Sequence, residues 1–229
     1  VTSIQIEGVD HEFSTVDGVV EDVVDLILNI KQIVVRLEDA DTRTLYLSAK
    51  GAGTVTAGDL KLPAGIEVVR RRSGGGAVLV EPEGVVWVDV VIPPTDPLWD
   101  DDVGRAAHWV GRAWVRALDA MGIDGATVHT DGLVTTDWSD LVCFGGLGPG
   151  EVVVDGAKVV GVSQRRTRHG ARFQTAVLLR WRPADLLALL DVGDGRRRSD
   201  ALDDLTSRAL PVDVDGPALV DSLVASLPS

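Results

Sequence analysis

Basic residues followed by glycines form the stretch of this chain best suited to bind an anion. The run Arg70-Arg71-Arg72-Ser73-Gly74-Gly75-Gly76 places a flexible glycine segment directly after a basic cluster. Glycine lets the backbone approach a ligand closely, and its amides can then donate to an anion. The run is not a P-loop, because no Gly-Lys-Ser/Thr comes after it, and it is not a dinucleotide fingerprint, because no helix comes after it. It indicates either an anion-binding loop or a solvated turn.

Lys158 is the second candidate for chemistry, because it lies on an otherwise apolar strand. The Asp155-Gly156 dipeptide just before it predicts a tight turn within a β-hairpin over residues 151–164. Burying an unpaired ammonium is costly. We therefore expect Lys158 to have a buried partner, a ligand anion, or an exposed strand face.

Cys143 is the single cysteine, so the chain has neither an internal disulfide framework nor a cysteine-rich zinc site. As a nucleophile it would need a nearby base, and no histidine clearly stands beside it. The alternative is a small buried hydrophobic residue in a strand. We assign no metal-binding residues.

The elements that position these residues can be read from apolar periodicity. Residues 77–80, 85–92 and 172–179 are expected to be strands. Residues 101–121 predict the clearest helix, with acidic residues at its start and Gly122 at its end. Trp109 and Trp114 fall on its apolar stripe and are expected in the core. A helix starts over 183–190, and residues 191–229 read as a polar linker with two short helices.

The first segment has a different pattern and carries no catalytic constellation. Residues 1–7 alternate apolar and polar positions as a strand does, and residues 15–31 have helical periodicity. Residues 33–37 and 43–49 read as further strands. Glycines and a proline punctuate residues 51–63, which predicts turns there.

Composition narrows the class of protein. The 229 residues are 45% hydrophobic and 25% charged, the profile of a globular protein. The net charge of −13 argues against direct nucleic-acid binding, which needs a basic face. No apolar run reaches the ~20 residues that span a bilayer, so no membrane association is expected. Without a signal peptide, a cytoplasmic location is expected. The chain starts at Val1, so we expect its natural N-terminus to precede it.

Residues 70 to about 190 resemble the lipoate protein ligase and octanoyltransferase family within the biotin/lipoate ligases. The resemblance rests on three motifs in the right order: Arg70 to Val78, Asp140 with Cys143-Phe144, and Asp155-Gly-Ala-Lys-Val-Val-Gly-Val-Ser-Gln-Arg165. It implies an α/β (α+β) fold with a mixed sheet backed by helices. Val80-Glu81 and Phe173-Gln174-Thr175 depart from the family's histidine positions.

The same resemblance implies site residues and substrates. Lys158 would contact the acyl carbonyl and phosphate of an acyl-adenylate, and Cys143 would be catalytic only in a transferase. Residues for substrate and nucleotide binding would be Arg70, Arg71, Ser73, Gly74, Gly75, Gly76, Asp140, Gly161 and Ser163. ATP and Mg²⁺ would be used with lipoate or octanoate. The partner would be a lipoyl-carrier protein, either a lipoyl domain or the glycine cleavage H protein.

Residues 1–69 resemble the insert domain of the bacterial RNA polymerase α subunit. The stretches Val1-Thr-Ser-Ile-Gln-Ile-Glu-Gly-Val-Asp-His and Thr54-Val-Thr-Ala-Gly-Asp-Leu60 are the most specific. In that family the insert packs on the large polymerase subunits and does no chemistry. Polymerase subunits are therefore expected partners of this segment alone.

The chain divides into three segments: 1–69, a partial polymerase-insert-like segment; 70–190, a catalytic domain; and 191–229, a linker with short helices. We favour an enzyme that attaches lipoate or octanoate to a carrier lysine through an acyl-adenylate. The alternatives are a cysteine-dependent octanoyltransferase, a non-enzymatic polymerase α fragment, and a fusion without function of its own. The change of resemblance at Val69–Arg70 limits what can be expected of the enzyme, because it falls beside the expected binding loop.

Overall fold

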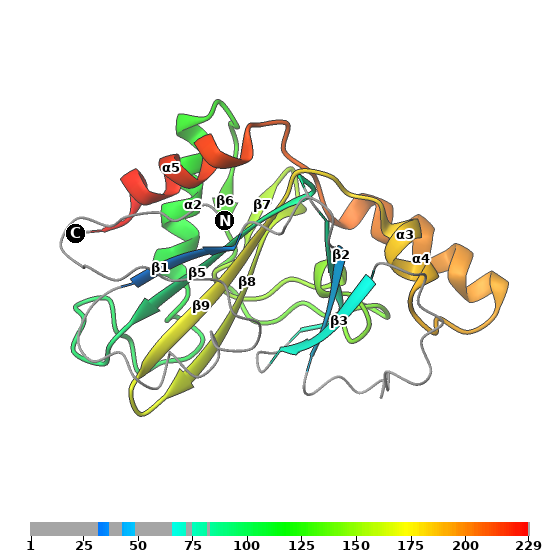
Figure 1. Ribbon diagram of the computed structural model, residues 1–229, viewed down its shortest axis with the longest axis horizontal. Coiled ribbons are helices and arrows are strands. Elements are labelled where there is room, and N and C mark those ends of the chain that lie inside the picture. Colours follow the sequence, from blue (N-terminus) through cyan, green and yellow to red (C-terminus); the bar gives the residue numbers. More distant parts are fainter. Residues whose placement is uncertain (1–31, 37–42, 49–65, 72–74, 82, 229) are drawn as a thin grey trace.

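The computed structural model describes residues 32–36, 43–48, 66–71, 75–81 and 83–228. A six-stranded antiparallel sheet and a smaller three-stranded sheet make up its framework (Figure 1). The larger sheet has the order β1 (Gln32–Arg36), β5 (Val85–Ile92), β9 (Gly170–Leu178), β8 (Ala157–Thr167), β7 (Val152–Val154) and β6 (Thr127–Val128). The predicted helix-backed sheet is thus confirmed, with antiparallel pairing throughout the larger sheet.

The three-stranded sheet has the order β3 (Ile66–Arg71), β2 (Arg43–Ser48), β4 (Val78–Val80). β2 pairs parallel to β3 and antiparallel to β4, so mixed pairing is found here. The strands predicted at 33–37 and 43–49 are confirmed as β1 and β2, within a residue at each end. The strand predicted at 1–7 and the helix predicted at 15–31 lie outside the described residues.

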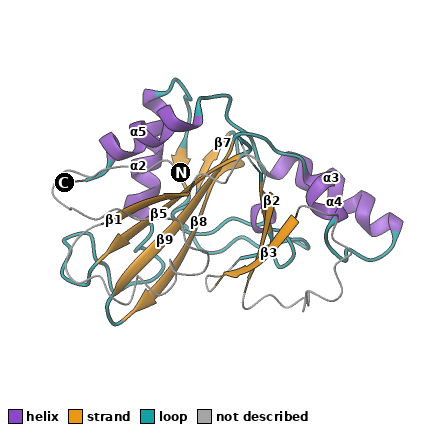
Figure 2. Ribbon diagram, viewed as in Figure 1, coloured by secondary structure: helices purple, strands orange, loops and turns teal. Residues whose placement is uncertain are grey.

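Helices stand on both flanks of the sheets (Figure 2). They are α2 (His108–Ala120), α3 (Pro183–Ala188), α4 (Gly195–Arg208) and α5 (Gly216–Ser226). α2 and α5 lie side by side on the larger sheet, where the Ser222 hydroxyl donates to the Ala117 carbonyl at 2.9 Å. α3 and α4 lie beyond β2 and β3. The two helices predicted within 191–229 are present, but α5 packs into the main core, where a polar linker was expected.

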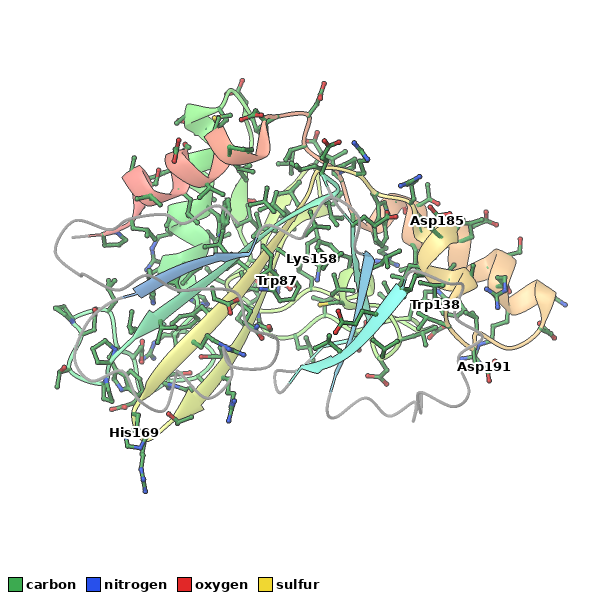
Figure 3. The ribbon with its side chains drawn as sticks, in the orientation of Figure 1. Trp87, Trp138, Lys158, His169, Asp185 and Asp191 are labelled. Carbon is green, nitrogen blue, oxygen red and sulfur yellow. The ribbon has the colours of Figure 1, made fainter. Side chains whose placement is uncertain are left out.

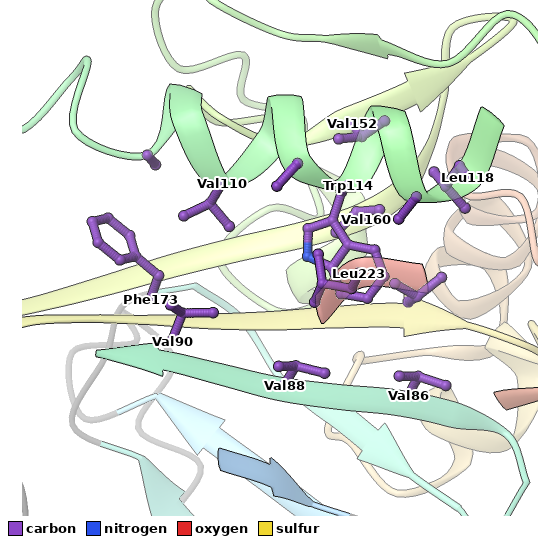
Figure 4. Packing of buried hydrophobic residues seen from close by; sticks show 14 of the residues in the cluster. Val86, Val88, Val90, Val110, Trp114, Leu118, Val152, Val160, Phe173 and Leu223 are labelled. Atoms are coloured by element: carbon purple, nitrogen blue, oxygen red, sulfur yellow. The ribbon is translucent and has the colours of Figure 1, made fainter. Parts of the chain in front are cut away.

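The main core lies between α2, α5 and one face of the larger sheet (Figure 4). Val86, Val88 and Val90 project from β5 toward Trp114 of α2, and all four are buried. Trp109 is buried as well, so both tryptophans are core residues, as predicted. Alternate residues of β5 face this core because side chains alternate across a strand.

The predicted helix over 101–121 begins late. α2 starts at His108, and the acidic residues before it form turns, in which Asp102 accepts from the Gly104 amide at 2.8 Å. Aspartate side chains that bond nearby backbone amides compete with helix formation. The end is as expected: Gly122 has φ +80°, and the Ile123 amide donates to the Leu118 carbonyl at 2.9 Å. This is a Schellman-type cap, which satisfies carbonyls of the last turn.

Candidate active site

Lys158 lies on β8, in the region between the two sheets, and is almost completely buried (Figure 3). Its ammonium donates to a carboxylate oxygen of Glu151 and to the backbone carbonyl of Cys143, both at 2.8 Å. It also lies 5.2 Å from the centroid of the Phe144 ring, within cation–π range. Of the three possibilities that the sequence left open, the structure shows a buried partner.

Glu151 is that partner, and sequence reasoning missed it. Its residue is 4% exposed, and its carboxylate accepts from Lys158, from the Gly148 amide at 2.7 Å and from the Val162 amide at 3.1 Å. Three donors around one carboxylate compensate the loss of water on burial. The available signal was an acidic residue at the start of an apolar strand that also has a lysine on the facing strand.

A β-bulge sets the direction of Lys158. Val152 pairs with Val160 while the next β7 residue, Val153, pairs with Lys158, so Val159 is an extra residue on β8. Val159 and Val160 both enter the main core. A bulge changes which side the next residue faces, and here Lys158 lies against Phe144 rather than among the core residues. Period-two patterning alone could not predict this.

The glycine run meets the cysteine turn. The Ala77 amide donates to the Leu141 carbonyl at 2.8 Å, and the Cys143 amide donates to the Ala77 carbonyl at 3.0 Å. A Cβ on Gly76 would come within 2.5 Å of the Val142 amide nitrogen, so only glycine fits this approach without displacing backbone. Gly76, Cys143 and Lys158, which are far apart in sequence, therefore lie in one hydrogen-bonded cluster.

The other predicted site residues lie at different distances from this cluster. Gly161 is buried, and a Cβ on it would meet the Phe144 ring at 3.4 Å. Ser163 is half-buried further along β8, whereas Asp140 and Gly75 are exposed. Arg70 and Arg71 end β3. Ser73 and Gly74 lie outside the described residues.

A second buried ion pair lies on the sheet face opposite the main core. Asp89 of β5 and Arg172 of β9 are 1% and 2% exposed, with 3.8 Å between the nearest charged atoms. The Trp87 indole donates to Asp89 at 2.8 Å, and Gln174 pairs in register with Asp89. Sequence reasoning did not select Asp89 or Arg172.

Phe144 also lines a small cavity. Its lining combines apolar residues of β4, β9 and α3 with charged residues, among them Arg182 and Glu81, which form an ion pair at 3.2 Å. In the described ranges no group of three or more histidine, cysteine or acidic residues could hold a metal ion. None of the helices that the structure describes is long and apolar enough to cross a membrane.

Two family models match the chain over ranges that overlap. The lipoyl protein ligase A/B catalytic domain matches residues 59–214, and the RNA polymerase Rpb3/RpoA insert domain matches residues 4–83. The ligase match extends beyond the predicted limits at both ends, and the stretch with β3 and β4 lies in both matches.

The curated relatives of the first segment are RNA polymerase subunits. The chain is 59% identical over 68 residues to the DNA-directed RNA polymerase subunit alpha of Clavibacter michiganensis subsp. michiganensis, and 57% identical over 68 residues to that of Frankia alni. Each match covers 30% of this chain and 20% of the relative. The chain therefore spans about a fifth of the length of these relatives.

Solved structures of lipoate protein ligases share the fold. One is an archaeal bipartite ligase of Thermoplasma acidophilum, solved in a study with its E2 lipoyl domain: 18% identity, 90% of this chain, 74% of that chain and a TM-score of 0.66. A lipoate-protein ligase A bound with ATP matches at 17% identity, with 90% and 75% coverage and a TM-score of 0.63.

Coverage of 90% is more than residues 70–229 supply, so the shared fold reaches into the polymerase-like segment. The family match and the fold agree over the part of the chain that contains Lys158, Glu151 and Cys143. The chain belongs to the lipoyl protein ligase A/B catalytic domain family, which consists of ligase and transferase enzymes, and it carries an RNA polymerase α insert-like segment at its N-terminal end.

Proposed function

We propose that this protein activates lipoate or octanoate with ATP and transfers the acyl group to a lysine of a carrier protein. One observation carries the proposal: a buried lysine, Lys158, is joined by hydrogen bonds to the turn on which the glycine run packs. A fixed cation beside glycine amides is suited to a carboxylate and a phosphate that meet at one point.

The reaction would take place in two displacements. A carboxylate oxygen of the acid attacks the α-phosphate of ATP, and pyrophosphate leaves. The neutral amine of the carrier lysine then attacks the acyl carbonyl, AMP leaves, and the amine loses a proton. Both steps build negative charge on oxygen, which a preorganised cation stabilises by several kcal/mol. Lys158 would supply that cation by exchanging its bond to the Cys143 carbonyl for one to a substrate oxygen, while Glu151 keeps the ammonium in place.

The remaining predicted residues have roles in substrate binding under this proposal. Arg70, Arg71, Ser73 and the glycines 74–76 would hold the phosphates and the acyl group. Gly161, which lies beside Phe144 on β8, and Ser163, two residues further along the strand, would contact the substrate. Asp140, exposed on the turn before Cys143, would contact the nucleotide from outside.

Mg²⁺ would enter with the nucleotide. The described residues offer no cluster of three metal ligands. Mg²⁺ is commonly held by one or two carboxylates together with substrate phosphates and waters, so a dedicated protein cage is not needed. The ion would offset phosphate charge, and the chain's own contribution would remain the basic and glycine-rich segment.

The proposed carrier is a lipoyl domain or the glycine cleavage H protein. A structurally similar archaeal ligase was studied with its E2 lipoyl domain, which supports a partner of this kind. The test is incubation of the protein with ATP, lipoate and an apo lipoyl domain, followed by intact mass measurement of the carrier. We expect a mass increase of one lipoyl group that requires ATP. An unmodified carrier with either lipoate or octanoate would contradict the proposal.

The second candidate is a cysteine-dependent octanoyltransferase. It is favoured by the hydrogen bond from the Lys158 ammonium to the backbone carbonyl of Cys143, which puts the residue that carries the only thiol in the same cluster as Lys158. Acyl transfer from an octanoyl carrier without ATP, abolished in Cys143→Ser, would favour this route. ATP-dependent transfer that survives Cys143→Ser would favour the ligase.

A further inference from the structure

β2 is the middle strand of the three-stranded sheet, although it belongs to the polymerase-like segment. It pairs parallel with β3 over its full length, from Arg43 opposite Ile66 to Ser48 opposite Arg71. It pairs antiparallel with β4, where Tyr46 lies opposite Val78. Within the described part of the chain, β3 and β4 are joined to each other only through β2.

β2 pairs with the arginines at the start of the expected binding segment. Leu47 pairs with Arg70 and Ser48 pairs with Arg71, the last two residues of β3. β3 is an edge strand of this sheet, so its backbone is held by β2 on one side. The chain returns at Gly76–Ala77, which the Leu141–Cys143 turn fixes independently. The glycine end therefore has its own anchor, while the arginine end depends on β2.

We propose that β2 is a positioning strand of the ligand site: it sets the backbone of Arg70 and Arg71, and thereby the affinity for the nucleotide. The functional half of this statement rests on the proposed ligase activity. The polymerase-like segment is then a working part of the enzyme rather than an appendage joined to it.

Backbone chemistry explains how sequence from an unrelated family can do this. Strand pairing is made by main-chain N–H and C=O groups, which every residue except proline supplies. Side chains adjust the stability of the pairing, and Arg-Thr-Leu-Tyr-Leu-Ser contains the β-branched and aromatic residues that strands favour. A strand of suitable length can thus fill the position between β3 and β4 without family-specific motifs.

β1 provides the internal control. It also comes from the polymerase-like segment, but it lies at the edge of the larger sheet, where it pairs with β5 alone. Its partners run from Trp87 to Val91, and none of them belongs to β3 or β4. If β2 acts by position, disruption of β2 and disruption of β1 have different consequences for the ligand site.

The experiment compares Tyr46→Pro with Tyr46→Val and with Val34→Pro in the full chain. Proline removes a backbone donor and is poorly tolerated in a central strand, whereas valine keeps the N–H and favours strands. The first measurement is amide hydrogen exchange of peptides covering 66–71 and 78–80. We expect about tenfold faster exchange there in Tyr46→Pro, with peptides of α2 and α5 unchanged, and wild-type exchange at 66–71 in both controls.

The second measurement is the KM for ATP against kcat in lipoate adenylation. Tyr46→Pro should raise the KM about tenfold with kcat less affected, because the arginines lose position while Lys158 and Glu151 stay in place. Unchanged exchange at 66–71 in Tyr46→Pro, or an equal KM increase in Val34→Pro, would overturn the inference. An inactive wild type with the expected exchange pattern would instead reject the ligase function and the functional half of the inference, leaving the structural half supported.

Discussion

The two faces of the larger sheet differ in whether buried charge lies among their apolar side chains. Toward α2 and α5 the sheet presents Val86, Val88 and Val90, packed against Trp114 and other apolar residues (Figure 4). The opposite face carries the Asp89–Arg172 pair, and the Glu151–Lys158 pair lies toward Phe144. Both ion pairs are buried. Both faces bury apolar residues, including Trp87 and Leu178 on the second face, but buried ion pairs lie only on the second face within the described residues.

The contrast bears on what the buried charges contribute to the protein. Buried ion pairs contribute little net stability, because desolvation of two charges offsets their attraction. An apolar replacement of similar volume would stabilise the fold as well. Net stability therefore does not explain the two buried pairs, and under the proposed function the Glu151–Lys158 pair holds a fixed charge at the site. Substitutions in the main core should therefore change only stability, whereas substitutions in the Glu151–Lys158 pair should change both stability and activity.

The largest stability change is expected for Trp114→Ala on the helix face. Trp114 is fully buried, so its truncation removes apolar contacts and leaves a cavity. We expect the free energy of unfolding to fall by about 3–5 kcal/mol, measured by urea denaturation. The KM for ATP of the remaining folded protein should not change. A raised KM would contradict the claim that the main core affects stability and not nucleotide binding.

Removing one partner of the Glu151–Lys158 ion pair should lower the free energy of unfolding by nearly as much. Glu151→Gln leaves the Lys158 ammonium buried without its counterion, and we expect a loss of about 3 kcal/mol in unfolding free energy. The double variant Glu151→Gln/Lys158→Met removes both charges and should recover most of that loss. If the double variant is as unstable as the single one, charge compensation is not what Glu151 provides.

An intermediate effect is expected at Gly76. A Cβ there would lie within 2.5 Å of the Val142 backbone, so Gly76→Ala must displace the cysteine turn. Overpacking of this kind costs about 1–3 kcal/mol, and adenylation should fall because the turn carries the Cys143 carbonyl. Gly132→Ala is the matched control, since a Cβ there meets nothing within 4 Å. Equal effects in the two variants would show that the close packing at Gly76 is unimportant.

The smallest effect concerns the exposed ion pair before α2. Hydrogen bonds from Arg105 lower the pKa of Asp100 below its ordinary value of 3.8. A lowered pKa in the folded state adds stability above the unfolded pKa, and this is lost as pH falls through the folded value. Asp100→Asn should therefore lower the Tm slightly at pH 7 and not at about pH 2. A Tm difference that is independent of pH would show that the charge plays no part.

Local patterns in the sequence predicted much of the fold. The Asp155-Gly156 turn has positive φ at both residues, 50° and 81°, as a tight hairpin requires. Gly122 ends α2, and the strands of the second half occur in the predicted order. The predicted helix start was wrong where aspartate side chains bond the backbone, in the turns before His108. The packing of α5 was not predicted, because it depends on contacts that are distant in sequence. Such contacts leave no periodic signal.

The candidate site was predicted in its parts rather than in its geometry. The glycine run, Cys143 and Lys158 were selected from the sequence, and the structure brings Gly76, Cys143 and Lys158 together. Glu151 and the bulge at Val159 were not predicted, because a register shift cannot be read from apolar alternation. The change of resemblance at Val69–Arg70 also gave no sign that β2 pairs across it.

The most direct test of the proposed chemistry is lipoate-dependent exchange of labelled pyrophosphate into ATP, which reports acyl-adenylate formation without a carrier. It should be measured for the wild type and for the Glu151→Gln/Lys158→Met double variant, with folding of both checked by circular dichroism. We predict exchange in the wild type and a loss of about 10²–10³-fold in the folded double variant, the cost of removing one preorganised charge. No exchange in the wild type, or equal exchange in the two proteins, would contradict the assignment of Lys158 to the chemistry.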